Sequence, residues 1–284
     1  MAIPFRRSLK LCGYILETGK KTASLILAAG RGSRVESYNG NKTLLPLAPK
    51  KNPYEGSRPI LLQILKSLPA GPTAVVVNYK KEDIIEATHN FNLNYYEQPE
   101  LNGTGGALLS ARPFLERRGY SQLIITMGDV PFVRRDTYRS LVKKLKDNVL
   151  VLLGFCPKSK KQYGALEIEG NRVKRIIEWN YWKTYSKTKL KGFRIFNSGI
   201  YAARKDDILS YLLVLASRPH TVQKKIDGKL NVVEEFFITD LIEYMSDDGL
   251  SVGYVVAEDE EEVMGIDDLS ALMKAQEIFR TGKF

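Results

Sequence analysis

Short apolar runs alternate with segments of helical spacing through the first half of the chain. Aliphatic and β-branched runs predict buried strands at 25–29, 73–78, 93–97, 122–127 and 149–154. Helices are expected between these runs, at 59–68, 81–88, 105–115 and 135–146. Strands that alternate with helices in short units indicate a parallel sheet covered by helices on both faces. This alternation predicts an α/β fold.

The second half of the chain is less regular and predicts some antiparallel pairing. The stretch YGALEIEGNRVKRIIEW alternates apolar and polar residues around Gly170-Asn171, as expected for a β-hairpin. A further strand is expected in FRIFNSGIYAA, and helices at 234–245 and 269–279. We find no internal repeat and no Gly/Ser/Pro-rich linker long enough to separate domains. We therefore expect a mixed, mainly parallel sheet in one domain over residues 23–284, after an N-terminal extension over 1–22.

Composition restricts where such a chain works. With 284 residues, 44% of them hydrophobic, the chain can bury a large core. No apolar run approaches the length of a membrane span, and the basic N-terminus lacks the apolar core of a signal peptide. The two cysteines, Cys12 and Cys156, form no disulfide framework or metal pattern. A cytoplasmic protein without a membrane partner is expected.

The formal net charge of +11 is compatible with nucleic acid, an anionic surface or an anionic small substrate. The lysines and arginines are spread along the chain, and clusters such as 158–161 and 187–191 are short. No nucleic-acid-binding motif is present in the sequence. We interpret the excess charge as a solvated basic surface and expect no nucleic-acid partner.

A glycine-rich loop follows the first predicted strand, in LILAAGRGSRVESYNGNKTLLPL. Ligands of open α/β sheets bind at the carboxyl ends of the strands, where this loop and Gly128-Asp129 both fall. Gly30 and Gly32 allow close approach of the backbone to a ligand, and Arg34 and Lys42 add positive charge. The loop matches neither the P-loop pattern nor G-x-G-x-x-G. By itself it is equally compatible with a phosphate site and with a turn.

The loop is accompanied by other stretches that together resemble the sugar-phosphate nucleotidyltransferases. The glycine-rich loop resembles the family's L-A-A-G-x-G-[ST]-R signature, and Lys42 corresponds to the lysine that follows this signature in the family. The others, in the family's order, are EQPELNGTGGAL, ITMGDVPF, QYGALEIEGNRVKRIIEW, FNSGIYAA, EEFFITDLIEYM and EVMGIDDLSALMKAQ. Their order and spacing are most similar to the uridyltransferase domain of the bifunctional enzyme that makes UDP-N-acetylglucosamine. The resemblance covers about residues 23–280 and implies the Rossmann-like, GT-A-like nucleotidyltransferase fold.

The resemblance implies a role for each matching residue. Ala29 and Gly30 would meet the nucleotide, and Lys42 would neutralise its α-phosphate and the incoming sugar phosphate. Asp129 and Asp267 would hold Mg²⁺. The β- and γ-phosphates would be cradled by Gly32, Ser33 and Arg34. A pyrimidine base, most often uracil, would be bound by Gln98, Gly103 and Thr104. The sugar would be lined by Gly164, Glu178, Asn197 and Thr239.

Several of these residues have a structural alternative. Asp129 could cap a helix, and either Asp267 or Asp268 could cap the helix expected at 269–279. Glu178 could lie on the surface of a hairpin, and Asn197 could satisfy a strand end. The acidic run 258–262 is expected to be a solvated loop rather than a second metal site. His89 and His220 belong to no catalytic pattern and are expected at the surface.

The sequence departs from the family around the expected sugar side. Asn41 replaces the usual proline before the lysine, and the spacer VESYNGN is longer than usual. Ala165 stands where the family usually has arginine, and WNYWKTYSKTKLKGF is aromatic and basic. These changes affect the expected sugar more than the nucleotide.

The predicted function is therefore a Mg²⁺-dependent sugar-1-phosphate nucleotidyltransferase, in which Arg34, Lys42 and Asp129 are catalytic. Its partners would be a nucleoside triphosphate and a sugar-1-phosphate, with UTP and N-acetylglucosamine-1-phosphate favoured. One alternative is a cytidylyltransferase or molybdopterin nucleotidyltransferase on the same scaffold. Another is a non-catalytic nucleotide-binding regulator, which would not need to keep both cations and both carboxylates.

Overall fold

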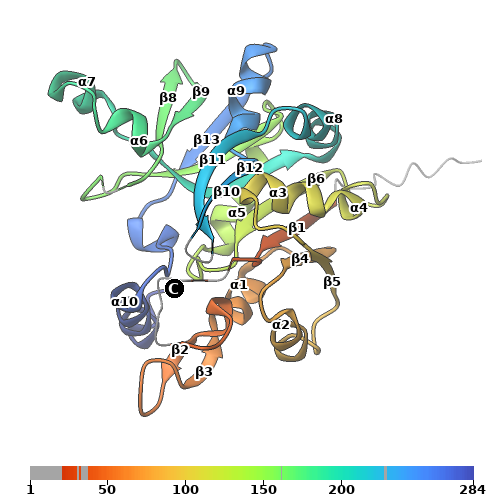
Figure 1. Ribbon diagram of the computed structural model, residues 1–284, viewed down its shortest axis with the longest axis vertical. Coiled ribbons are helices and arrows are strands. Elements are labelled where there is room, and N and C mark those ends of the chain that lie inside the picture. The colour runs from red at the N-terminus through yellow and green to blue at the C-terminus, as the bar shows by residue number, and fades with distance from the viewer. Residues whose placement is uncertain (1–20, 31, 33–37, 161, 227–228) are drawn as a thin grey trace, which may run out of the picture.

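A central sheet organises the computed structural model, which describes residues 21–30, 32, 38–160, 162–226 and 229–284 (Figure 1). Among these residues, nine strands form one sheet, and seven of them lie in the order β13-β7-β10-β6-β1-β4-β5. Their bounds are Thr22–Leu27 (β1), Thr73–Val77 (β4), Leu93–Glu97 (β5), Gln122–Met127 (β6), Leu150–Phe155 (β7), Phe196–Arg204 (β10) and Val252–Val256 (β13).

The direction of the strands divides the sheet into two kinds of pairing. β1 pairs parallel with β4 and β6, β4 with β5, and β13 with β7. β10 is antiparallel to both β6 and β7, and thus interrupts the parallel order. The hairpin of β8 (Ala165–Glu169) and β9 (Arg172–Ile177) joins this sheet through β10. The prediction of a mixed, mainly parallel α/β sheet is confirmed.

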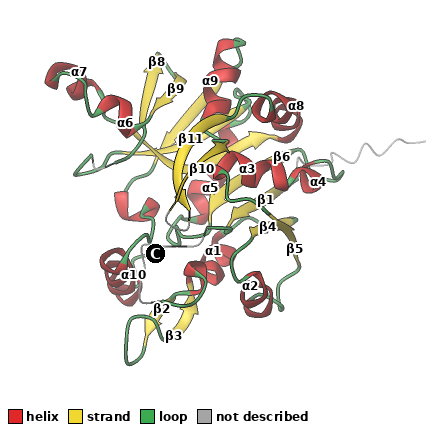
Figure 2. Ribbon diagram, in the orientation of Figure 1, coloured by secondary structure: helices red, strands yellow, loops and turns green. Residues whose placement is uncertain are grey.

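Helices cover both faces of the sheet (Figure 2). One face packs against α1 (Ile60–Ser67), α2 (Lys81–Ala87), α5 (Arg135–Lys144) and α10 (Leu269–Thr281). The other packs against α3 (Gly103–Ser110), α4 (Arg112–Leu115), α8 (Lys205–Ala216) and α9 (Asp240–Asp247). Side chains of β1 alternate between these layers, since Leu25 belongs to the second and Ile26 to the first. Both are fully buried, so burial on two faces explains the continuous apolar runs in the sequence.

Smaller elements surround this framework. A two-stranded ribbon, β2 (Pro46–Pro49) and β3 (Gly56–Pro59), lies beside α10, so that early and late parts of the chain adjoin (Figure 1). A second ribbon consists of β11 (His220–Ile226) and β12 (Lys229–Glu235). Two short helices, α6 (Trp179–Trp182) and α7 (Lys187–Gly192), follow β9, and two single 3₁₀ turns are η1 (Lys42–Leu44) and η2 (Glu260–Val263). In the described ranges, no helix combines the length and apolarity required to cross a membrane.

Two predicted helices are wrong in part. The helix expected at 105–115 is broken at Ala111, because Pro113 has no N–H to continue the hydrogen bonds of α3. The helix expected at 234–245 begins only at Asp240. Its first residues belong to β12, whose Glu234 and Glu235 pair with β11, and the backbone N–H of Phe236 donates to the carbonyl of Asn102 at 2.9 Å. Tertiary pairing thus overrides the local helical pattern.

Candidate active site

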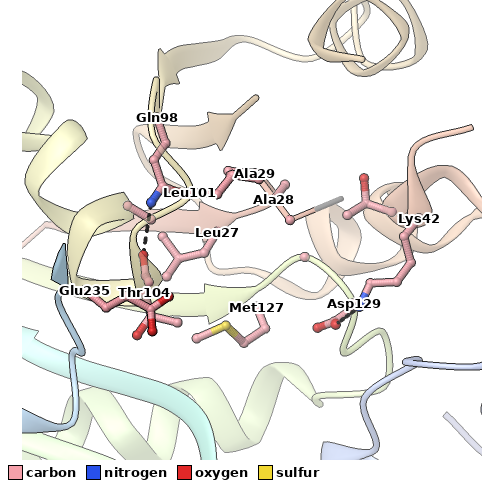
Figure 3. A pocket seen from close by; sticks show the side chains of 15 residues that line it. Leu27, Ala28, Ala29, Lys42, Gln98, Leu101, Thr104, Met127, Asp129 and Glu235 are labelled. Carbon is pink, nitrogen blue, oxygen red and sulfur yellow. Dashed lines mark hydrogen bonds and ion pairs between the residues drawn. The ribbon is translucent and has the colours of Figure 1, made fainter. Parts of the chain in front are cut away.

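A cavity of about 310 Å³ lies at the carboxyl ends of β1 and β6 (Figure 3). This first cavity is lined by Leu27, Ala28, Ala29, Gly30, Lys42, Thr43, Gln98, Leu101, Gly103, Thr104, Ala107, Met127, Gly128, Asp129 and Glu235. Figure 3 shows Gln98 and Thr104 at one end and Lys42 with Asp129 at the other. One end is therefore equipped with amide and hydroxyl groups, and the other with charges.

The loop at the amide end is held in shape by Gln98 and by the end of β12. The buried Gln98 side chain donates from Nε2 to Asn102 Oδ1 and to the Gly103 carbonyl, both at 3.0 Å. The N–H of Gly105 donates to the Phe236 carbonyl at 2.7 Å. Gly103 has φ +92°, and a Cβ there would lie 2.3 Å from the same carbonyl oxygen. Only glycine allows this contact, so the glycines of the loop dock it against residue 236.

At the charged end, one lysine contacts two carboxylates. The Lys42 ammonium lies 2.5 Å from Asp129 Oδ2 and 3.2 Å from Asp267 Oδ1. Asp129 follows β6, whereas Asp267 precedes α10, and the Ile266 N–H donates to the Asp129 carbonyl at 3.0 Å. Burial by itself lowers the pKa of Lys42, but the charges of Asp129 and Asp267 outweigh it and raise that pKa above its ordinary value. The lysine is therefore fully protonated at neutral pH.

Two neighbours fix the start of the lysine side chain. Asn41, which is fully buried, donates from Nδ2 to the Tyr79 carbonyl at 2.7 Å. Its Oδ1 accepts from the N–H of Thr43 at 3.0 Å and caps η1. Gly32 packs against the lysine stem, because a Cβ at that position would lie 2.7 Å from the Lys42 Cβ. The asparagine that replaces the family's proline thus anchors the turn from which Lys42 projects.

The structure separates the adjacent aspartates before α10. Asp268 is the N-cap of that helix and accepts a hydrogen bond from the Ala271 N–H at 2.8 Å. Asp267 contacts Lys42 instead, so the two alternatives left open by the sequence are assigned to different residues.

The acidic run 258–262 is not wholly a solvated loop, and that prediction is wrong for Glu262. Its side chain is fully buried, and Oε1 accepts from the Arg134 N–H at 3.0 Å and from the Thr137 hydroxyl. Both donors are at the start of α5, a helix without a side-chain cap of its own. A carboxylate at a helix N-terminus is stabilised by the free N–H groups and the helix dipole. Glu262 therefore fastens the segment that leads to Asp267.

The carboxylates of Asp129 and Asp267 have the chemistry and the position to bind a magnesium ion. Mg²⁺ prefers oxygen ligands and is usually held by one or two protein carboxylates, with water completing its shell. Oxygens of Asp129 and Asp267 both reach the same ammonium, so they converge on one place where a cation can be bound. No cluster of three or more His, Cys, Asp or Glu side chains fit to bind a metal occurs in the described ranges. Asp129 and Asp267 are therefore the described residues that could hold a metal ion.

A second cavity of about 760 Å³ adjoins the first, and Glu235 lines both. It is lined by the end of β9, by α6, by the start of α9 and by the first residues of β11. Its residues are Gln162, Arg175, Ile176, Ile177, Glu178, Trp179, Asn180, Tyr181, Tyr185, His220, Val222, Glu235, Phe237, Thr239, Asp240 and Glu243. Its wall combines aromatic rings with carboxylates, unlike the mainly aliphatic wall of the first cavity.

Carboxylates of the second cavity influence each other. Burial raises the pKa of Glu178, and the charge of Asp240 raises it further. Burial also raises the pKa of Asp240, although His220 partly opposes this. His220 Nε2 lies 2.9 Å from Asp240 Oδ2, and the imidazole packs against the Phe237 ring. The histidine is 46% exposed, so its expected place at the surface is confirmed, and it also lines the second cavity.

The remaining residues expected near a sugar lie around Glu178. Thr239 lines the second cavity together with it. The Asn197 N–H donates to the Gly164 carbonyl at 2.8 Å, and its Nδ2 contacts the Tyr201 hydroxyl at 3.0 Å. A Cβ at Gly164 would lie 3.2 Å from Glu178 Oε2. Gly164 thus adjoins Glu178 and is hydrogen-bonded to Asn197, but neither Gly164 nor Asn197 belongs to the set that lines the cavity.

The chain is similar to known proteins over most of its length. The family model of the MobA-like NTP transferase domain matches residues 24–165, which is half of the chain. The chain belongs to this family. The match contains every residue that lines the first cavity except Glu235. The resemblance to nucleotidyltransferases inferred from the motifs is confirmed.

Relatives and solved structures extend the similarity of this NTP transferase domain beyond residue 165. The bifunctional protein GlmU of Novosphingobium aromaticivorans is 29% identical over 261 residues, covering 89% of this chain and 52% of the relative. The chain thus spans about half the length of that relative. The uridine diphosphate N-acetylglucosamine pyrophosphorylase of Trypanosoma brucei superposes with a TM-score of 0.71 at 12% identity, over 90% of this chain and 64% of that one.

A third similar protein is covered over its full length. A nucleotidyl transferase from Methanothermobacter thermautotroptrophicus has a TM-score of 0.59 at 18% identity, over 93% of this chain and all of that one. At such identities the solved structures show a shared fold.

The predicted site residues of this NTP transferase domain are partly brought together. Seven of them line the first cavity: Ala29, Gly30, Lys42, Gln98, Gly103, Thr104 and Asp129. Gly32 and Asp267 contact or adjoin Lys42. Ser33 and Arg34 lie outside the described residues. The sequence did not predict Glu235, His220 and Asp240 as residues of the site. They come together only because β11 pairs with β12 and because α9 packs nearby.

Proposed function

We propose that this NTP transferase domain is a Mg²⁺-dependent sugar-1-phosphate nucleotidyltransferase. The observation that supports this most is the arrangement of the first cavity, with a glycine-rich amide loop at one end and a lysine with two carboxylates at the other. A nucleoside triphosphate needs both ends, since its base is bound by hydrogen bonds and its phosphates by the lysine and by a divalent cation that the two carboxylates can hold. A second cavity beside the first gives room for an acceptor.

The nucleotide lies in the first cavity in this proposal. Gln98, Gly103 and Thr104 bind the base, and Ala29 with Gly30 lies along the nucleotide. Gly32, Ser33 and Arg34 hold the β- and γ-phosphates, since backbone N–H groups of a glycine-rich loop and a guanidinium suit phosphate oxygens. Lys42 contacts the α-phosphate, the atom group at which substitution takes place.

The acceptor lies in the second cavity and presents its phosphate toward Lys42. Glu178 and Thr239 form hydrogen bonds with sugar hydroxyls, and Gly164, which Asn197 holds by a hydrogen bond, leaves room for the Glu178 side chain. Carboxylates are common partners of hydroxyl groups because they accept several hydrogen bonds. Aromatic rings line the same wall, and the exposed Tyr181 is the one that we expect to stack on a sugar ring.

The chemistry requires charge neutralisation and alignment rather than a general base. The phosphate oxygen of the acceptor attacks the α-phosphorus, the bond to the β-phosphate breaks, and pyrophosphate leaves. The acceptor phosphate is already ionised, so no proton has to be removed. Lys42 and Arg34 lower the repulsion between the two anions and stabilise the transition state. Mg²⁺ bound by Asp129 and Asp267 would add Lewis-acid stabilisation of the phosphate oxygens.

UTP and N-acetylglucosamine-1-phosphate are the substrates we favour. The order and spacing of the motifs, which resemble a uridyltransferase domain that makes UDP-N-acetylglucosamine, support this choice. The name of one fold neighbour, a pyrophosphorylase of uridine diphosphate N-acetylglucosamine, supports it too. We further propose that residues 23–284 form one domain and that the enzyme works in the cytoplasm. Neither nucleic acid nor a membrane is a partner in this proposal.

A panel assay tests the proposed function. The protein is incubated with Mg²⁺, each of the common NTPs and several sugar-1-phosphates, and pyrophosphate release is measured. Release that requires both substrates, and is fastest with UTP and N-acetylglucosamine-1-phosphate, is the expected result. Absence of release with every pair would contradict an enzymatic function.

One observation favours a second candidate. The second cavity is lined by four carboxylates, Glu178, Glu235, Asp240 and Glu243, together with several aromatic rings. Such a wall also suits a cationic head group, through charge and cation–π contact. A cytidylyltransferase acting on an alkylammonium phosphate is therefore the alternative. Release with CTP and phosphocholine, but with no sugar phosphate, would support it.

A further inference from the structure

The Lys42 ammonium is bound where the assigned metal ligands converge. It contacts Asp129 Oδ2 at 2.5 Å and Asp267 Oδ1 at 3.2 Å. Only 13% of the Lys42 side chain is exposed, compared with 21% for Asp129 and 53% for Asp267. The Lys42–Asp129 contact is thus partly sheltered from water, whereas the Lys42–Asp267 contact is exposed on the aspartate side. A hydrogen bond between charged groups is stronger where water is partly excluded.

An ammonium and a divalent cation compete for the same carboxylate oxygens. Each of the two aspartates contributes an oxygen to Lys42, and one ammonium neutralises half of their combined charge. A metal entering beside Lys42 would meet both a reduced negative charge and direct repulsion from the ammonium. Tight binding of the metal to both aspartates is therefore favoured by movement of the Lys42 ammonium away from them.

The bound nucleotide provides a new partner for the displaced lysine. Lys42 lines the first cavity together with Gly30, and Gly32 packs on its stem. A lysine side chain is a flexible stem with a compact charge, and its ammonium can turn from a carboxylate to a phosphate without movement of the backbone. Asn41 holds that backbone through buried hydrogen bonds.

We propose that Lys42 is an internal cation that occupies the metal position in the nucleotide-free protein and turns to the phosphates when nucleotide and metal bind together. The inference rests on the proposed function for the identity of its ligands. Its consequence is that the protein alone binds a divalent cation weakly, and that nucleotide and metal strengthen each other's binding. The lysine thus prevents idle loading of the metal site.

Binding of Mn²⁺, a paramagnetic substitute for Mg²⁺, tests this in the absence of nucleotide. Free Mn²⁺ is followed by electron paramagnetic resonance during titration of the wild type, Lys42→Met and Lys42→Arg. We expect Lys42→Met to bind Mn²⁺ on the order of ten- to a hundred-fold more tightly than the wild type, a usual range for coupled sites. Lys42→Arg keeps the cation and should bind as weakly as the wild type. Lys50→Met, a change at an exposed lysine, is the matched control and should not change the affinity.

Further variants identify the site of Mn²⁺ binding and control for unfolding. Addition of Asp129→Asn to Lys42→Met should remove the gained affinity, which identifies the site. Lys42→Gln replaces Lys42→Met if circular dichroism shows that the latter is unfolded. Equal Mn²⁺ affinity of the wild type and of the folded Lys42 variant would overturn the inference, whatever pyrophosphate release shows. A gain in affinity without release from any substrate pair would leave the inference standing and contradict the proposed function.

Discussion

The two cavities are assembled from different kinds of segment. The first is lined by the ends of the parallel strands β1 and β6, by the residues just after β1, β5 and β6, and by residues of η1 and α3, nearly all within the range matched by the family model. The second is lined mainly by residues after 165, from the antiparallel β9, the short α6, the β11–β12 ribbon and α9. Parallel strands end at one edge of a sheet and so concentrate their loops there. No such rule places the residues of the second cavity. In the proposed function, changes in its wall would change which acceptor is bound.

The largest effect is expected at the charged end of the first cavity. Asp129→Ala removes a carboxylate that we assign to the metal, and kcat should fall by about a thousand-fold or more. Steady-state release of pyrophosphate measures this, and circular dichroism checks the fold. Asp136→Ala, at an exposed aspartate of α5, is the control and should retain full activity. Substantial turnover of the Asp129 variant would refute its assignment.

A smaller effect is expected at the amide end. Gln98→Ala removes the two hydrogen bonds that shape the 98–105 loop. The KM for the nucleotide should rise about ten- to a hundred-fold, while the KM for the acceptor stays within error. Measurement of both KM values decides the outcome. A rise limited to the acceptor would mean that the cavities have been assigned in reverse.

The second cavity should respond in the opposite way. Glu178→Gln removes a charge that faces the acceptor but keeps the shape of the side chain, so the acceptor KM should rise about ten-fold. The KM for the nucleotide should not change. Glu169→Gln, at an exposed carboxylate at the end of β8, serves as control. An unchanged acceptor KM would exclude Glu178 from recognition.

The smallest effect concerns stability and pH. The pKa of Glu178 is raised by burial and by Asp240, so folding favours its protonated form. This contribution is present below the ordinary carboxyl pKa of about 4 and is lost as the pH rises through the raised value. Glu178→Gln does not titrate and should show a small rise in Tm over the wild type near pH 7, but none near pH 3. Thermal unfolding at both pH values checks the sign, and a lower Tm near pH 7 would contradict it.

The same contrast explains what the sequence could predict. Strands β4, β5, β6 and β7 and the residues that follow them were foreseen, because an apolar run and its loop are local in the chain. Lys42 was placed with Asp129 and Asp267 only through the family resemblance, yet in the folded chain Lys42 contacts both aspartates. No periodicity could have shown that contact, since the three residues come from different parts of the chain.

The failures share a cause. Glu262 resembles a solvated acid but caps α5 from a distance, and residues 234 and 235 have a helical pattern but pair with β11. His220 and Asp240 are paired across the ribbon and α9. In each case a partner distant in sequence decides the structure, and the local pattern of a single sequence does not show which distant residue that partner is.

The central feature of the proposed function is transfer between two bound anions, one in each cavity. Phosphorus NMR of the protein with Mg²⁺, UTP and N-acetylglucosamine-1-phosphate tests this directly, because both products are seen at once. We predict that pyrophosphate and the phosphodiester of a UDP-sugar grow in equal amounts, and that neither forms when the acceptor is omitted. Consumption of UTP without acceptor, or pyrophosphate without a matching UDP-sugar, would contradict the account.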